Sequence, residues 1–164
     1  MSTDAKTVYE GSLRNTHAAE HQGLTQMKGQ VNTLDEYPEY KALLQRHITT
    51  TESQLDRIER ALEELGTSTS AFKEAVTSTV GAIGAAGHRM AQDATLKNLY
   101  AGYAYQYEQI GAYRSLAIIA DRAGYAAHRS WIDQSIGEEE RAAEEVKAII
   151  EPVTRKYLDL TLNG

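Results

Sequence analysis

Four polar side chains occupy positions where amphipathic helices would carry apolar ones. On helical wheels of 100° per residue, Glu20, Gln106 and Glu139 each lie in the middle of an apolar stripe, and His47 lies at the edge of another. An ionised carboxylate in an apolar core is very unfavourable unless it is paired, protonated or bound to a metal. These residues therefore predict a buried site that is either a metal centre or a hydrogen-bonded polar layer.

The metal interpretation follows from the way helix bundles build dinuclear centres. Di-iron and di-manganese sites take one Glu from each of two helices and a Glu-x-x-His pair from each of two others. Carboxylate and imidazole ligands suit iron or manganese, which makes Glu20, His47 and Glu139 the candidate metal ligands, with Gln106 as a polar neighbour. The chain contains no Glu-x-x-His sequence, so these residues predict one weakly bound ion more readily than a pair of ions.

The alternative interpretation needs no metal. Glu20 and Glu139 would hydrogen-bond to His47, Gln106 and nearby tyrosine hydroxyls, because buried polar networks of this kind can fix the register of packed helices. Tyrosines gather in the third long helical stretch, where we expect core rings with hydroxyl donors. They are Tyr100, Tyr103, Tyr105, Tyr107 and Tyr113.

Three further polar residues near these positions are expected to lie outside the site. His17 and His21 flank Glu20, but both are displaced toward the solvent side of the wheel. Glu138 is followed by other acidic residues and is expected on a solvated acidic face, with only Glu139 pointing inward.

The elements that must position these residues are helices. Sustained helical periodicity and the breakers between periodic stretches predict one all-α domain over residues 1–164, built as a four-helix bundle with an additional short helix. Pro152 is expected to kink or end the last long helix. The long helices are expected at about 4–33, 38–65, 93–122 and 125–150 with a tail, and the short one at 71–91.

Composition excludes several classes of protein. There are 23 acidic and 17 basic residues, which disfavours a nucleic-acid partner, and no apolar run is long enough to span a membrane. The N-terminus lacks a basic region followed by an apolar one, so a cytoplasmic location is expected. Tyr37, Tyr40 and Trp131 have no obvious place in the core of one bundle and suggest a homodimer.

Six segments of the chain together resemble the YciE/YciF-type bacterial ferritin-like family, over about residues 10–160. The resemblance implies a ferritin-like antiparallel bundle that is commonly a homodimer and is linked to bacterial stress responses. The segments are HAAEHQ (17–22), RHITTTESQLDRI (46–58), LKNLY (96–100), IGAYRSL (110–116), EEE (138–140) and VTRKYL (153–158).

The chain departs from the pattern of that family at the expected metal ligands. The family usually reads Glu-His-aromatic-Glu where this chain has QYEQ (106–109), and it commonly has Glu where Thr50 stands. Glu20, His47 and Glu139 match the family. Replacing Glu by Gln keeps the shape and the hydrogen bonding but removes the charge that a metal needs. The resemblance thus implies a partly degraded dinuclear centre.

Three functions remain open from the sequence. The first is a stress-associated dimeric scaffold or weak metal binder without enzymatic activity. The second is an active di-iron or di-manganese protein that handles iron or peroxide, in which Glu52 and Glu108 replace lost ligands. The third is an interaction module that presents an acidic helical face.

Overall fold

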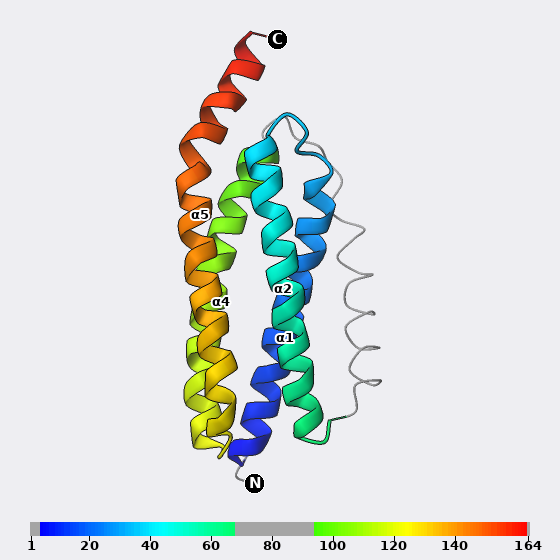
Figure 1. The fold of residues 1–164 in the computed structure, drawn as a ribbon, viewed down its shortest axis with the longest axis vertical. Coiled ribbons are helices and arrows are strands. Elements are labelled where there is room, and N and C mark those ends of the chain that lie inside the picture. Colours follow the sequence, from blue (N-terminus) through cyan, green and yellow to red (C-terminus); the bar gives the residue numbers. More distant parts are fainter. Residues whose placement is uncertain (1–3, 68–93, 164) are drawn as a thin grey trace.

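The computed structural model describes residues 4–67 and 94–163, which form a bundle of long helices (Figure 1). Within these ranges no β-strand occurs, so the all-α prediction is confirmed. The expected short helix at 71–91 lies outside the described residues. In the order of the chain, the described elements are α1 (Ala5–Val31), α2 (Pro38–Glu64), α4 (Ala94–Arg122), a 3-10 turn, η2 (Ala126–His128), and α5 (Arg129–Leu162).

Helix ends follow local capping chemistry. The Asp4 carboxylate caps α1 by accepting a hydrogen bond of 2.7 Å from the backbone N–H of Thr7. Pro38 opens α2, where its missing N–H costs no helical hydrogen bond. Gly66 and Gly124 follow α2 and α4 with φ of 84° and 85°, a left-handed conformation that favours glycine after a helix.

Helix α5 is longer than the sequence predicts, and the expectation that Pro152 ends or kinks it is wrong in part. The helix continues through Pro152 to Leu162, and its last turns extend past the other helices (Figure 1). Val153, the next residue, is only 4% exposed and packs in an apolar cluster. Burial of this side chain offsets the loss of one backbone hydrogen bond at the proline.

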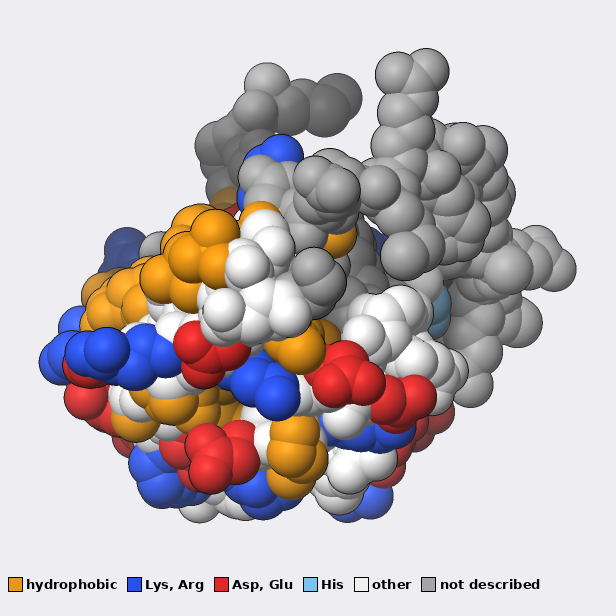
Figure 2. All heavy atoms as spheres, turned by 90° about the horizontal axis from the view of Figure 1, so that it is seen from above, with side chains coloured by type: hydrophobic (Ala, Val, Ile, Leu, Met, Phe, Trp, Pro, Cys, Tyr) orange, Lys and Arg blue, Asp and Glu red, His pale blue; other side chains and the backbone are white. Residues whose placement is uncertain are grey.

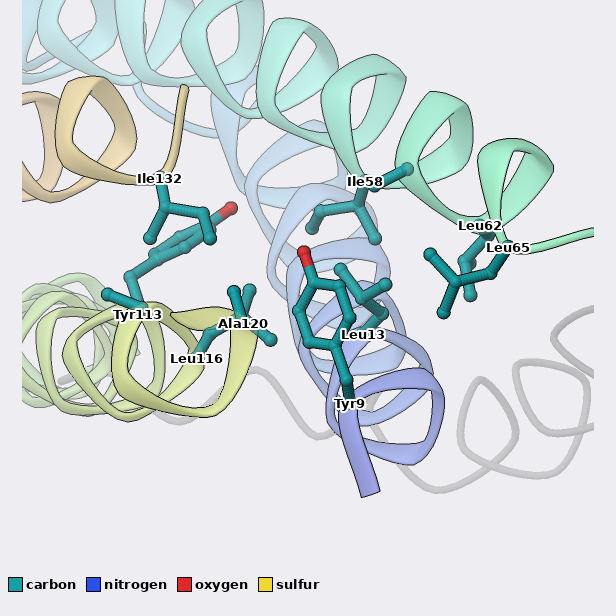
Figure 3. Close-up of a cluster of buried hydrophobic side chains, with 11 residues drawn as sticks. Tyr9, Leu13, Ile58, Leu62, Leu65, Tyr113, Leu116, Ala120 and Ile132 are labelled. Atoms are coloured by element: carbon teal, nitrogen blue, oxygen red, sulfur yellow. The ribbon is translucent and has the colours of Figure 1, made fainter. Parts of the chain in front are cut away.

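The core consists of two apolar clusters, one toward each end of the bundle. All four long helices contribute to the first cluster, whose side chains converge in Figure 3. It includes Tyr9, Leu13, Ile58, Leu62, Tyr113, Leu116 and Ile132. The second cluster is also built from all four helices. It includes Met27, Leu34, Tyr40, Leu43, Leu99, Val146 and Val153.

The aromatic residues that suggested a homodimer belong to these clusters, so that argument is wrong. Tyr40 is 3% exposed in the second cluster, and Tyr37 packs against it. Trp131 packs against the first cluster. A helical wheel shows only the face of one helix, and these side chains find their partners on neighbouring helices.

Candidate functional site

A layer of polar side chains separates the two apolar clusters. On α1, Glu20 lies midway between Leu13 of the first cluster and Met27 of the second. Each of the three other long helices, α2, α4 and α5, also carries buried polar residues at this level of the bundle. This polar layer consists of Glu20, Gln54, Gln106, Gln109 and Glu139, each no more than 4% exposed.

All four residues singled out from the sequence are buried, as predicted. Glu20 is 0% exposed, and His47, Gln106 and Glu139 are each at most 6% exposed. Gln54 and Gln109 also lie wholly in the interior. Helical periodicity did not predict either of them; Gln109 was noted only through the family resemblance, as one of the two glutamines that stand where the family has glutamate.

The Glu20 carboxylate receives one hydrogen bond on each oxygen. Tyr113 Oη donates to Oε1 at 2.8 Å, and Tyr105 Oη donates to Oε2 at 2.5 Å. Burial raises the pKa of Glu20, and this effect outweighs the two hydrogen bonds, which lower the pKa. The expected contact with tyrosine hydroxyls is therefore present at Glu20.

Tyr105 reaches Glu20 because α1 carries a glycine at position 23. A Cβ atom built on Gly23 would lie 2.4 Å from Cζ of the Tyr105 ring, far inside contact distance. Glycine costs an α-helix about 1 kcal/mol relative to alanine. At this position, that cost is offset by the close approach of the ring that donates to the buried carboxylate.

Glu139 is the second buried acid and interacts with the first. Burial raises the pKa of Glu139, the charge of Glu20 raises it further, and the side chain of Gln54 lowers it in part. No hydrogen bond from the described residues reaches Oε2 of Glu139. Two carboxyl groups that interact in a buried site do not both ionise readily, so this pair favours holding a proton.

A neighbouring ion pair was not anticipated, and the prediction that Glu138 is solvated is wrong. Arg57 Nη1 and Nη2 donate to Oε2 and Oε1 of Glu138 at 2.7 and 2.8 Å, and Arg57 also donates to Ser135. Gln54 donates to the same carboxylate at 3.2 Å. Burial raises the pKa of Glu138, but hydrogen bonds led by that from Arg57 outweigh it and leave the pKa below its ordinary value.

His47 has a different partner from the one expected. Its Nε2 lies 3.3 Å from Oε2 of Glu145, near the surface, whereas the hydrogen bonds of Glu20 come from Tyr105 and Tyr113. Burial lowers the pKa of His47, and Glu145 offsets this only in part. His47 and Glu139 nevertheless line the same cleft between α2 and α5.

Two other histidines, His17 and His128, are buried, which helical periodicity does not predict. His17, expected toward solvent, is 2% exposed, and its Nε2 is 2.9 Å from Glu59. His128 lies between Tyr9 and Glu64, with contacts of 2.8 and 2.6 Å. These contacts join residues on different elements, which a single-helix wheel cannot detect.

The described side chains do not fit a dinuclear iron or manganese centre. Among residues 4–67 and 94–163, no group of three His, Asp or Glu side chains is arranged to hold one metal ion. Both oxygens of Glu20 accept tyrosine hydroxyls, and Gln106 and Gln109 are neutral. The assignment of Glu20, His47 and Glu139 as ligands of iron or manganese remains a prediction.

Comparison with known families places the chain in a group. Its sequence matches the family described as "Domain of unknown function (DUF892)" over residues 4–159. The chain belongs to this DUF892 family. The fold is also similar to that in the crystal structure of a protein from Xanthomonas campestris pv. campestris str. ATCC 33913. The two structures superpose with a TM-score of 0.79, and the two sequences are 21% identical. That alignment covers 96% of this DUF892 chain and 98% of the other protein.

Replacing Gly23 with alanine should destabilise the protein, although alanine is the better helix former. The added Cβ displaces the Tyr105 ring and breaks its hydrogen bond to Glu20. We expect the free energy of unfolding, measured by urea denaturation, to fall by about 1–3 kcal/mol. Gly29→Ala, at an exposed position of the same helix with open space around it, should stabilise by about 0.5–1 kcal/mol. Equal effects of the two substitutions would refute the role given to Gly23.

Replacing Glu139 with glutamine should stabilise the metal-free protein increasingly as the pH rises. The pKa of Glu139 is raised above its ordinary value of 4.5, so the wild-type protein loses stability between that value and the folded-state pKa. Glutamine does not ionise, so the variant should gain about 1–3 kcal/mol relative to wild type between pH ~5 and pH ~8. Glu144→Gln, at an exposed carboxylate, should show no such trend. A Glu139→Gln advantage that shrinks with rising pH would contradict this assignment.

Proposed function

We propose that this chain is a ferritin-like, stress-associated scaffold in which a hydrogen-bonded polar layer has replaced a dinuclear metal centre. One observation carries the proposal: both oxygens of the central carboxylate, Glu20, are engaged by tyrosine donors. Glu139 lies close enough for the charge of Glu20 to raise its pKa. The two acids are thereby suited to sharing protons, and the layer contributes register and packing specificity to the bundle.

The charges around the layer support the same proposal. Two of its side chains, Gln106 and Gln109, are neutral where the ferritin-like pattern carries acids. The guanidinium of Arg57 lies in a bidentate pair with Glu138 beside the layer. Because its charge is balanced within this pair, the Glu138 carboxylate is not free to hold a second divalent metal ion beside the layer.

An active iron- or peroxide-handling enzyme is the runner-up and is less well supported. It requires Glu52 and Glu108 to replace the missing ligands. Glu52 is half exposed and pairs with Lys28 at 2.6 Å, and Glu108 is exposed. Neither side chain belongs to the interior layer.

An acidic interaction module also receives little support from the surface. Glu138 and Glu145, on the supposed acidic face of α5, pair with Arg57 and Arg46. On the face of the molecule in Figure 2, acidic and basic side chains are interspersed with apolar ones. No helix among the described residues is sufficiently long and apolar to traverse a membrane. A cytoplasmic location remains a prediction from the sequence.

A second copy of the chain is the partner that we propose. Tyr100, Tyr107 and Ile118 are 50%, 51% and 70% exposed, contrary to the expectation that the α4 tyrosines all lie in the core. Their spacing places them on one face of α4, with the exposed Gly111 between them. Large apolar side chains around a glycine favour close packing of another helix, and an isologous α4–α4 contact would bury all of them.

Restoring the missing acids should restore metal binding. The triple variant Thr50→Glu, Gln106→Glu, Gln109→Glu adds three carboxylates at the positions where the ferritin-like family has glutamate. We expect iron or manganese to copurify with the variant at one to two ions per chain, and the parent, purified without chelator, to carry less than one. Elemental analysis of the purified proteins measures both.

The control must add the same charge elsewhere. Glutamates in place of Gln45, Thr49 and Ser115, all exposed, should leave the metal content at the parental level. If the triple variant keeps its helicity and binds no more metal than this control, the degraded-centre proposal is wrong. A parent that already carries two ions per chain would contradict it as well.

The proposed dimer predicts the effect of charges on the exposed α4 face. Light scattering should give the wild-type protein a mass near twice the 18.1 kDa of one chain. Tyr107→Glu with Ile118→Glu should lower the mass to that of one chain, because charges on the contact face are desolvated without a partner. Val8→Glu, at a similarly exposed apolar residue of α1, should leave the mass unchanged. A dimer that survives the α4 substitutions would exclude this face.

A further inference from the structure

A second buried polar cluster lies away from the polar layer, where η2 joins α4 to α5. His128 of η2 is 6% exposed and lies between Tyr9 of α1 and Glu64 of α2. Its Nδ1 is 2.8 Å from Oη of Tyr9, and its Nε2 is 2.6 Å from Oε2 of Glu64. The Tyr9 ring is wholly buried in the first apolar cluster (Figure 3), whereas the Glu64 side chain is 63% exposed. The three groups therefore form a continuous line of hydrogen bonds from the core to the surface.

With a neutral imidazole, every group along this line is satisfied. Burial raises the pKa of Tyr9, and the charge of Glu64 raises it further, so the phenol keeps its proton and donates to Nδ1 of His128. The other ring nitrogen then carries the imidazole hydrogen, which Nε2 donates to the Glu64 carboxylate. His128 is thus a buried base with a phenol on one side and a carboxylate on the other.

This arrangement suits the removal of one electron from Tyr9. A phenol that loses an electron becomes a strong acid, and a buried phenol has no water at hand to take the proton. Nδ1 of His128 lies at hydrogen-bond distance to accept it. The positive charge that the imidazole gains is balanced by the Glu64 carboxylate at Nε2.

Aromatic rings connect Tyr9 to the surface. The ring centroids of Tyr9 and Tyr125 are 5.3 Å apart, and the His128 ring lies 6.1 Å from that of Trp131. Tyr125 and Trp131 are half-buried and pack against the first cluster. An oxidant that meets either ring at the surface can therefore draw an electron from Tyr9 over a short distance without entering the core.

We propose that Tyr9 is a redox-active tyrosine that gives one electron to a small radical oxidant, of which the azide radical is an example, and its phenolic proton to His128. The oxidant becomes an anion, Tyr9 becomes a neutral tyrosyl radical, and His128 becomes an imidazolium ion paired with Glu64. One electron and one proton thus leave Tyr9, and both are accounted for. The inference goes beyond the proposed function, because it uses no residue of the polar layer.

Other tyrosines are less suited to this reaction. Tyr105 and Tyr113 donate to Glu20, but burial already favours protonation of that carboxyl group, which makes it a poorer acceptor for another proton. Tyr107 is half exposed, so a radical there is open to coupling with another chain. Burial of Tyr9 prevents such coupling and should give its radical a longer lifetime.

Pulse radiolysis of the full chain with the azide radical tests the inference, with tyrosyl radicals detected by optical absorption and electron paramagnetic resonance. The wild-type protein should form a long-lived tyrosyl radical, and its formation should be slower in D₂O because a proton moves with the electron. Tyr9→Phe should abolish this radical, while the phenyl ring still fills the first cluster. Tyr40→Phe, at a similarly buried tyrosine of the second cluster, should leave it unchanged.

His128→Gln distinguishes a base from a mere hydrogen-bond partner. The glutamine amide can accept a hydrogen bond from Tyr9 but does not take up a proton. We therefore expect loss of the long-lived radical, with circular dichroism showing that the fold is kept. A long-lived radical that persists in Tyr9→Phe or in His128→Gln, or its absence from the wild-type protein, would overturn the inference and leave these hydrogen bonds a structural role only.

Discussion

Two carboxyl groups, Glu20 and Glu139, are buried in the middle of the bundle, and the surrounding structure depends on how their charge is satisfied. Tyr105 and Tyr113 donate to Glu20, and no described residue donates to Oε2 of Glu139. Desolvation and the mutual repulsion of the acids favour protonated forms. This requirement explains why donors, amides and an ion pair gather at one level of an otherwise apolar core.

The polar layer also fixes how the helices align along the bundle axis. It separates two apolar clusters, so a shift of any one helix by a turn would place a carboxyl or amide group among apolar side chains. Gly23 shows how strictly this alignment is constrained, because the Tyr105 ring occupies the space that a side chain at position 23 would need. Specificity of packing, rather than net stability, is what buried polar groups of this kind provide.

Periodicity within each helix was sufficient to predict the fold and the burial of Glu20, Gln106 and Glu139. It did not predict the contacts between helices, because these depend on how each helix is rotated about its own axis relative to its neighbours. Three features depend on such contacts between helices and were not predicted. They are the pairing of Arg57 with Glu138, the contact of His47 with Glu145 and the burial of His17. The expectation that Pro152 ends or kinks α5 was wrong in part for the same reason. Val153, the next residue, packs against other helices in the second cluster, and this packing favours continuation of the helix.

The central claim is that protons, rather than metal ions, neutralise the buried carboxyl pair in the resting protein. Isotope-edited infrared spectroscopy of glutamate carboxyl groups tests it most directly, on metal-free protein near neutral pH, where exposed carboxyls are ionised. We predict an absorption band from a protonated carboxyl group in the wild-type protein that disappears in Glu139→Gln or in Glu20→Gln. A spectrum in which every glutamate is ionised would contradict the account.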